Sequence, residues 1–388
     1  MKSEWTYRPL GELVSFASGG TPSKKRDDYW GGTIPWISAK TLKTENIDTS
    51  DLFITEEGLK AGSKIAPKGS ILLLTRGSGL FNGIPIARVE KDVAFNQDIK
   101  CLDSYGEVEN EFVFYWLLSQ KDYLMAKVGV TGIGAGKFDL GFLQKLMIPI
   151  PSERERKSIV GFASSISEKI RCNAKVNDNL EQQAAALFSS LYNRSNTEVR
   201  YTDLIQILGG GTPKTGETAY WNGNIAFFTP KDVGTPYTFI TEKTITEEGL
   251  SHCNSRLYPV NTVFVTARGT VGKVGLSGVP MAMNQSCYAL VGKETHQLLV
   301  YFYTLKAVDR LKHKASGAVF DAITTREFDS EQIMKLSDDD AKAFLCVAEP
   351  MFQEILNNSI ENLRLSTLRD FLLPKLMSGE IDVSSVQL

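Results

Sequence analysis

Two stretches of the chain place apolar residues alternately four and three positions apart, the pattern of a helix that packs along one face against a partner helix. In the first stretch these seam positions are Ile159, Ala163, Ile166, Ile170, Asn173, Asn177, Leu180, Ala184, Leu187 and Leu191. In the second stretch, displaced by 185 residues, they are Phe344, Ala348, Met351, Ile355, Asn358, Asn362, Leu365, Arg369, Leu372 and Leu376. The pattern predicts two long helices that pair as a coiled coil, with asparagines near the centre of each seam.

Local signals mark where these helices begin. Ser152 followed by Glu155, and Ser337 followed by Asp340, place a hydroxyl and a carboxylate where they satisfy the free backbone amides of a first helical turn. Pro350 falls inside the second helix. Because proline lacks an amide hydrogen, we expect it to bend or break the first turns of that helix.

The segments before the helices, 1–151 and 196–336, alternate short β-rich runs with glycine, proline, asparagine and aspartate. This alternation is typical of a mixed α and β domain. Residues 112–118 and 298–305 are helical stretches rich in aromatic side chains, and we interpret both as core rather than as binding surfaces.

The two domains are copies of one another. Gly-Thr-Pro at 20–22 recurs at 211–213, and Thr-Glu-Glu-Gly-Leu at 55–59 recurs at 246–250, both at an offset of 191 residues. A five-residue match at a fixed offset indicates a tandem duplication. The predicted fold is α+β and consists of domain 1 at 1–151, a spacer helix at 152–195, domain 2 at 196–336, and a second helix with its tail at 337–388.

This order makes the two helices antiparallel, because each leads away from one domain, and it predicts a pseudo-twofold arrangement. When the two seams are centred on each other, facing residue numbers sum to 535. Asn173 is then expected to face Asn362, and Asn177 to face Asn358. Buried amide pairs of this kind penalise slipped registers. The alternative is that the asparagines face water or a docked protein.

Composition limits the class of protein. The 388 residues are 42% hydrophobic and 23% charged, and no apolar run reaches the roughly 18 residues that a membrane helix needs. The N-terminus lacks the pattern of a secretory signal, so we expect a cytoplasmic protein. The five cysteines and three histidines are scattered, which fits neither a disulfide framework nor a metal site.

Basic residues in loops are the candidate contacts with an anionic polymer such as DNA. A net charge of −2 disfavours nucleic-acid binding unless the basic side chains are concentrated on one face or a larger partner supplies most of the phosphate contacts. Arg76 and Arg268 each follow an apolar run and precede a glycine, where a guanidinium can bind phosphate or guanine. The other candidates are Lys24, Lys25, Arg26, Lys40, Lys214, Lys231, Lys273, Lys312 and Lys314, the last two beside Arg310 and His313. Solvated loops, internal hydrogen bonds and charges that complement a helix C-terminus are the alternative interpretations.

No complete catalytic pattern occurs in the sequence. The glycines at 132–136 with Lys137 approach a phosphate-binding loop, but Thr131 and Phe138 stand where that motif needs glycine and a hydroxyl residue. We therefore predict a flexible loop there. Asn-Pro-Pro-Tyr and Asp-Pro-Pro-Tyr, the segments that adenine methyltransferases use, do not occur.

Taken in order, the motifs resemble the specificity subunits of type I restriction-modification systems. The resemblance rests on Gly-Thr-Pro, Tyr-Trp-x-Gly and Ile-Pro-Trp-Ile-Ser-Ala-Lys within 20–40, Thr-Arg-Gly at 75–77, Ala-Arg-Gly-Thr-Val-Gly-Lys at 267–273, the Asn-Gln pairs at 96 and 284, and Leu-Pro-Lys-Leu-Met-Ser-Gly-Glu at 373–380. The second copy departs from this pattern at 226–230.

The resemblance implies two target-recognition domains that each read one half of a split site in double-stranded DNA. It implies helices that act as a ruler and as the docking surface for two methyltransferase (modification) subunits, with separate restriction subunits. S-adenosylmethionine, ATP and magnesium would then be bound by these partners, and this chain would not be an enzyme by itself.

Two other functions stay open at this point. A stand-alone duplicated DNA-binding regulator would bind DNA tightly without partners. An enzyme built from duplicated domains would need a catalytic constellation that the sequence does not offer.

Overall fold

A computed structural model describes residues 5–132, 134–234, 236–314 and 322–383. The chain divides into two units, unit 1 formed by Met1–Ile170 with Leu363–Leu388, and unit 2 formed by Arg171–Asn362. Two long helices, α6 (Glu153–Arg194) and α11 (Asp338–Met377), each contribute residues to both units. The units therefore group each predicted domain with segments of both helices.

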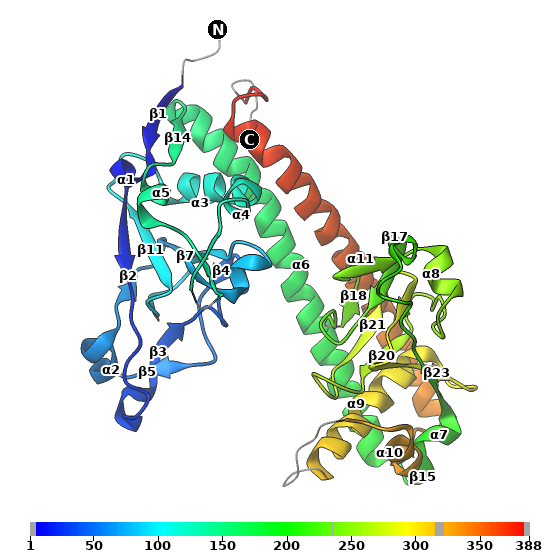
Figure 1. The fold of residues 1–388 in the computed structure, drawn as a ribbon. Helices are drawn as coiled ribbons and strands as arrows, with labels where there is room; N and C mark the ends of the chain where they lie inside the picture. Colours follow the sequence, from blue (N-terminus) through cyan, green and yellow to red (C-terminus); the bar gives the residue numbers. More distant parts are fainter. Residues whose placement is uncertain (1–4, 133, 235, 315–321, 384–388) are drawn as a thin grey trace. The chain divides into compact units, whose positions relative to one another are not determined.

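Among its described residues, unit 1 holds four sheets, and several of their strands are labelled in Figure 1. Its elements before α6 are β1 (Thr6–Pro9), α1 (Leu10–Leu13), β2 (Val14–Ser18), η1 (Asp27–Tyr29), β3 (Trp30–Ile37), β4 (Asn46–Ile47), β5 (Phe53–Ile54), α2 (Glu56–Gly62), β6 (Ile65–Ala66), β7 (Ile71–Leu74), β8 (Arg76–Gly77), η2 (Ser78–Phe81), β9 (Ile86–Val89), β10 (Val93–Phe95), β11 (Ile99–Ser104), α3 (Asn110–Ser119), α4 (Lys121–Met125), β12 (Gly129–Val130), β13 (Gly136–Lys137), α5 (Leu140–Gln144) and β14 (Met147–Ile150). The strand orders are β2-β11-β7-β9-β4, β5-β3-β10-β6, β12-β13-β8 and β1-β14.

Unit 2 repeats this architecture. Its elements between the long helices are β15 (Thr197–Arg200), α7 (Tyr201–Leu204), β16 (Ile205–Gly209), η3 (Thr218–Tyr220), β17 (Trp221–Phe228), β18 (Tyr237–Thr238), β19 (Lys243–Ile245), α8 (Glu247–Ser251), β20 (Val263–Thr266), β21 (Val274–Ser277), β22 (Met281–Met283), β23 (Cys287–Gly292), α9 (Gln297–Lys314), α10 (Thr325–Ser330) and β24 (Gln332–Lys335). The strand orders β16-β23-β20-β21-β18 and β15-β24 match those of unit 1, and β19-β17-β22 matches β5-β3-β10. Among the described residues of unit 2, β6 and the sheet β12-β13-β8 are represented only by the isolated bridges Tyr258–Met281 and Arg268–Ala322. The predicted α+β fold and its duplication are confirmed.

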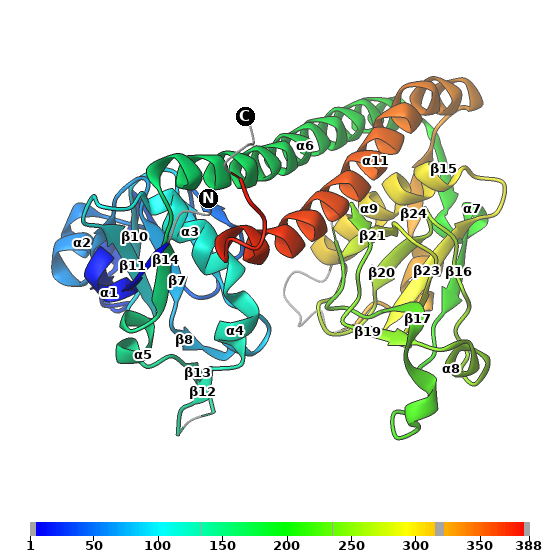
Figure 2. The same ribbon diagram turned by 90° about the horizontal axis from the view of Figure 1, so that it is seen from above.

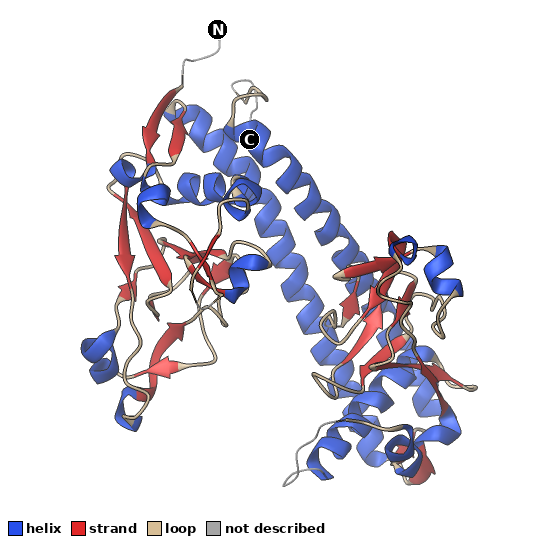
Figure 3. Ribbon diagram, viewed as in Figure 1, coloured by secondary structure: helices blue, strands red, loops and turns tan. Residues whose placement is uncertain are grey.

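In each unit a helix with many buried aromatic side chains, α3 or α9, packs against the five-stranded sheet (Figure 3). Residues 112–118 of α3 and 298–304 of α9 are buried. The interpretation of these stretches as core is confirmed.

Residues that repeat between the copies hold the backbone of each unit together. The threonine of the Thr-Glu-Glu-Gly-Leu run caps a short helix, and the threonine of Gly-Thr-Pro bonds the glutamine of the Asn-Gln pair. The contacts are Gly58 N–H to Thr55 Oγ1 at 3.1 Å and Gly249 N–H to Thr246 Oγ1 at 3.0 Å, then Thr21 to Gln97 and Thr212 to Gln285. The repeated motifs thus form a scaffold that is common to both units.

Both long helices begin as predicted. The Glu155 N–H donates to Ser152 Oγ at 3.3 Å, and the Asp340 N–H donates to Ser337 Oγ at 3.1 Å. The expected break at Pro350 does not occur, because α11 is helical throughout Asp338–Met377. Pro350 lies on the exposed side of α11, so water can satisfy the carbonyl group that lost its partner, while Phe344 and Ala348 on the other side are fully buried.

Within unit 2 the two helices run antiparallel, and the asparagines lie between them. Asn173 Nδ2 donates to Asn362 Oδ1 at 2.9 Å, and Asn358 Nδ2 donates to Asn177 Oδ1 at 3.0 Å. These are the pairs whose residue numbers sum to 535. The Asn173 amide also donates to Glu361 at 2.7 Å, and Asn173 is buried, so both of its amide hydrogens have acceptors.

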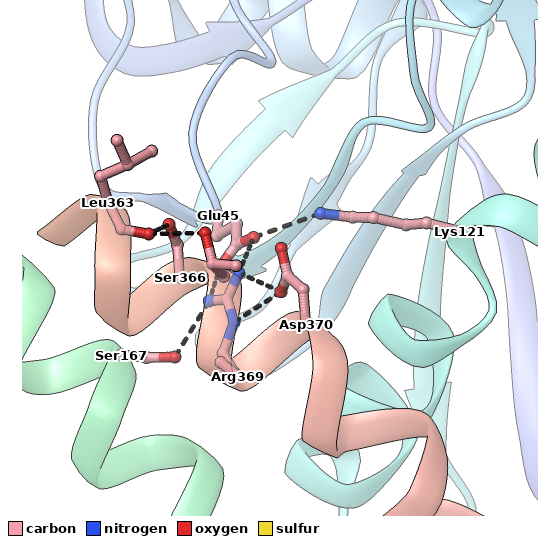
Figure 4. Close-up of polar contacts among 8 residues, drawn as sticks. Glu45, Lys121, Ser167, Leu363, Ser366, Arg369 and Asp370 are labelled. Atoms are coloured by element: carbon pink, nitrogen blue, oxygen red, sulfur yellow. Dashed lines mark hydrogen bonds and ion pairs between the residues drawn. The ribbon is translucent and has the colours of Figure 1, made fainter. Parts of the chain in front are cut away.

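Within unit 1 the antiparallel pairing continues through Ile159 and Leu376, which belong to one apolar core. The charged seam residue Arg369 is also explained there, because its guanidinium forms a bidentate ion pair with Glu45, at 2.5 Å and 2.9 Å (Figure 4). Ser167, Asp370 and the ammonium group of Lys121 complete this cluster at 3.2, 3.0 and 3.2 Å.

The Arg369–Glu45 pair has no counterpart in unit 2. The repeat offsets place Ala184 at the position of Arg369 and Pro236 at the position of Glu45. Burial raises the pKa of the Glu45 carboxyl, but the hydrogen bonds and charge of Arg369, with the charge of Lys121, outweigh burial and hold that pKa below its usual value. Glu45 is therefore ionised at neutral pH.

Candidate nucleic-acid interface

Arg76 and Arg268 occupy equivalent places in the two units. Each follows a buried strand, β7 or β20, and each has an exposed side chain. Their backbone amides donate to the carbonyl groups of Asp98 and Ser286, both at 3.2 Å. Among the described residues neither guanidinium has an ion-pair partner, so both remain available to an anionic ligand.

A second strand crosses beside each arginine. In unit 1, β13 pairs with β8 (Figure 2). The register of this pair places Lys137 opposite Arg76. In unit 2, an isolated bridge places Ala322 opposite Arg268. The prediction of a flexible loop around Lys137 is wrong for residues 136–137, which form a strand because tertiary pairing with β8 orders them. Lys137 is not among the candidate DNA contacts predicted from the sequence, because a two-residue strand gives no local signal of its pairing with β8.

The loops that carry Lys40 and Lys231 lie beside these crossings. A side chain added at Gly77 would contact Ala39 Cβ at 3.8 Å, and one added at Gly269 would contact Pro230 Cβ at 3.8 Å. Lys40 and Lys231 directly follow these neighbours, and both are exposed. Lys231 forms an exposed ion pair with Glu242 at 3.2 Å, which is a weak interaction that a DNA phosphate can replace.

Unit 2 gathers further cations on the turn between β20 and β21. Gly269 and Gly272 adopt positive φ values of 81° and 74°, which let the turn close tightly between Arg268 and Lys273. The end of the Lys312 side chain covers Gly272, because a Cβ there would lie 2.5 Å from Lys312 Cε. Lys312 of α9 thus brings its side chain beside the turn that carries Arg268 and Lys273.

The last residues of α9 are positioned by an internal carboxylate. Glu331 is completely buried and forms ion pairs with Lys314 and, at 2.8 Å, with Arg310. His313 Nδ1 lies 2.8 Å from the Asp309 carbonyl oxygen. Lys314 and Arg310 therefore anchor the end of α9, unlike the neighbouring Lys312.

The loop of Lys24, Lys25 and Arg26 is exposed and is fastened by a tryptophan, since Trp30 Nε1 donates to the Ser23 carbonyl at 3.2 Å. Trp221 fastens the equivalent loop at Lys214, donating to its carbonyl at 3.1 Å. Arg26 is bidentately paired with Asp28, at 2.8 Å and 2.6 Å, and this raises the pKa of its guanidinium. The exposed lysines of these loops are therefore better placed than Arg26 to meet phosphates.

The described residues contain no cluster of three or more histidine, cysteine, aspartate or glutamate side chains that could hold a metal ion. The five cysteines are free thiols, of which Cys101 and Cys287 are buried. No helix in the described part of the chain is both long enough and apolar enough to cross a membrane.

Comparisons with known proteins match most of the chain. A family model described as the type I restriction modification DNA specificity domain matches residues 2–182 and again 193–335. The MjaIX specificity subunit of a type I restriction enzyme from Methanocaldococcus jannaschii is 24% identical over 416 residues, covering 99% of this chain and 95% of that protein. The EcoR124I/EcoR124II specificity subunit from Escherichia coli is 30% identical over 161 residues, 41% of this chain and 40% of that one.

A crystal structure of the S subunit of a type I restriction-modification system from M. genitalium aligns with 96% of both chains, with a TM-score of 0.54 and 17% sequence identity. At this identity the structural likeness shows a shared fold. The two stretches matched by the family model each contain one copy of the arginine crossing.

Proposed function

This chain belongs to the type I restriction-modification DNA specificity family, as a specificity subunit with two recognition domains, and we propose that each domain reads one half of a split DNA site. One observation carries the proposal. The two units share a scaffold, yet side chains at equivalent positions beside the arginines differ, with an exposed Lys137 in unit 1 and a half-buried Ala322 in unit 2. A common scaffold with different exposed groups is what two readers of different half-sites require.

The subunit is not catalytic itself and functions with DNA and with the other subunits of the restriction-modification complex. We propose that two methyltransferase subunits dock on α6 and α11, where Leu368 and Phe371 expose apolar surface, and that restriction subunits join them. These partners would bind S-adenosylmethionine, ATP and magnesium. They would also supply the phosphate contacts that a chain with a net charge of −2 lacks.

The experiment is a domain exchange read by methylation sequencing. The chain is expressed with its cognate methyltransferase subunit in a host without adenine methylation, and residues 1–151 are replaced by the first domain of a relative. We expect methylation of a two-part motif, of which the exchange changes one half. The control replaces residues 196–336, which should change the other half.

The proposal fails if either exchange changes both halves, or if the complex methylates no split motif. Tight, sequence-specific DNA binding by the chain without a methyltransferase subunit would instead support a stand-alone regulator. Methylation or ATP hydrolysis by the isolated chain would contradict its non-catalytic role.

A further inference from the structure

We propose that unit 1 touches DNA at the crossing of β8 and β13, and that Lys137 helps to determine which half-site unit 1 accepts. The inference rests on the proposed function and names where that function is carried out. It also predicts that the equivalent position in unit 2, Ala322, has the same role.

The first observation is an unfavourable pair of charges. Arg76 and Lys137 stand directly opposite each other in an antiparallel pair, so their side chains emerge on the same face, with Cβ atoms about 4.5–5.5 Å apart. Like charges in this arrangement destabilise a sheet. No described carboxylate forms an ion pair with Arg76 or Lys137. The backbone carbonyl of Asp98 accepts from the Arg76 N–H, but the Asp98 carboxylate accepts a hydrogen bond from Asn96. A bound anion would therefore neutralise two like charges that no described carboxylate neutralises.

The second observation is the apolar surface next to these cations. Leu80 of η2 packs against Gly136 of β13, which places η2 beside the crossing. Phe81 of η2 is 43% exposed, and Val130 of β12, the strand next to β13, is 70% exposed. Cations next to exposed apolar side chains suit the major groove of duplex DNA, where phosphates and guanine take the charges and thymine methyl groups take the apolar contacts.

The third observation is the internal comparison. One backbone hydrogen bond is shared by both crossings, since the Phe138 N–H donates to the Thr75 carbonyl and the Ile323 N–H donates to the Ala267 carbonyl, both at 2.9 Å. The residue opposite the arginine differs, with lysine in unit 1 and alanine in unit 2. Because this hydrogen bond holds the second segment at the same place beside each arginine, the difference changes what each crossing can contact.

The test uses the complete methyltransferase complex with K137A, R76A and A322K. We expect K137A and R76A to weaken binding to a duplex with the methylated motif by about 5- to 100-fold. K137A should alter the unit 1 half of the motif, and A322K should alter only the unit 2 half. K137A should leave the melting temperature unchanged or raise it, because it removes a repulsion, so a loss of binding is not a loss of folding.

The matched control is K91A. Lys91 is exposed and belongs to the same unit, but the register of β7 with β9 places it at the far end of these strands from Arg76. K91A should leave affinity and both halves of the motif unchanged.

Three results would overturn the inference while a split motif is still methylated, which keeps the proposed function intact. K137A and R76A with the affinity of the unchanged complex would remove the crossing from the interface. A K137A loss that is uniform over all sequences, with the salt dependence reduced by about one charge, would make Lys137 a phosphate contact with no role in specificity. An A322K variant that alters the unit 1 half would contradict the equivalence of the two crossings.

Discussion

Removing Glu45 should destabilise unit 1 much more than removing an exposed carboxylate. In E45A the Arg369 guanidinium stays buried without its bidentate partner. Breaking a buried ion pair by deleting one partner costs about 3–5 kcal/mol when both charges are fully enclosed. Because the Glu45 carboxylate is 28% exposed and Arg369 keeps Asp370 and Ser167, we expect about 1–3 kcal/mol here.

The measurement is a double-mutant cycle of E45A, R369A and the double variant by thermal and urea unfolding. Each kcal/mol should lower the Tm of a domain of this size by about 2–4 °C. The double variant should be more stable than the sum of the single effects predicts, by about 1–3 kcal/mol, because it leaves neither charge without its partner. Unit 2 shows that this position folds without the pair, since it carries Ala184 and Pro236.

The coupling should also depend on pH in one direction. The pKa of Glu45 is lowered in the folded chain, so its contribution is fully present above the usual glutamate value of 4.5. It is lost as the pH falls through the lowered folded pKa, where the carboxylate takes up a proton. The coupling measured at pH 7 should therefore shrink in strong acid.

The matched control is the ion pair of Glu153 and Lys157 at 2.5 Å on α6, whose side chains are 66% and 69% exposed. Water screens this pair, so its cycle should show no measurable coupling. Equal coupling in the two cycles, or a Glu45–Arg369 coupling that persists unchanged in strong acid, would refute the reasoning.

Three further results are expected. S152A should lower the free energy of unfolding by about 0.5–2 kcal/mol through loss of the α6 cap, whereas S152D should retain most of the stability. Equal losses in the two variants would exclude capping as the cause. N173L should lower the Tm because it removes the hydrogen bond between Asn173 and Asn362, and N173L/N362L should restore the Tm. A double variant that is no more stable than N173L would contradict the pairing. Inserting seven residues after Asn177 and seven before Asn358 keeps the seams in register and adds about 10 Å of helix, which should lengthen the unread spacer in the methylated motif without changing either half-site. An unchanged spacer would exclude the helices as a ruler.

The features that the sequence predicts well are those with a repeating or local physical signal. The spacing of the seam residues predicted the two helices and the pairs of asparagines whose residue numbers sum to 535. A serine followed three positions later by an acidic residue predicted where each helix begins. These signals depend on neighbours within one or two turns, or on a partner seam of equal length. The duplication supported the fold class for the same reason, because the five-stranded sheet and the helix packed against it are present twice.

The features that were missed depend on partners far away in the sequence. Glu45 lies in a loop and meets Arg369 across 324 positions, so no local pattern marks it. The two-residue strand β13 has no periodicity and forms only because β8 lies beside it. The expectation for Pro350 considered only the hydrogen bond that a proline removes from a helix, whereas its exposed position lets α11 continue unbroken.

The order in which the two units can be completed during synthesis follows from the segments that make up unit 1. Residues 171–362, which make up unit 2, are continuous, but unit 1 needs residues from both sides of them. Ile159 and Ala163 on α6 share their apolar core with Leu373 and Leu376, which the ribosome adds roughly 10–40 s later at ordinary rates of translation. During that interval the α6 surface of unit 1 is uncovered on the nascent chain, and the domain that is begun first is completed last.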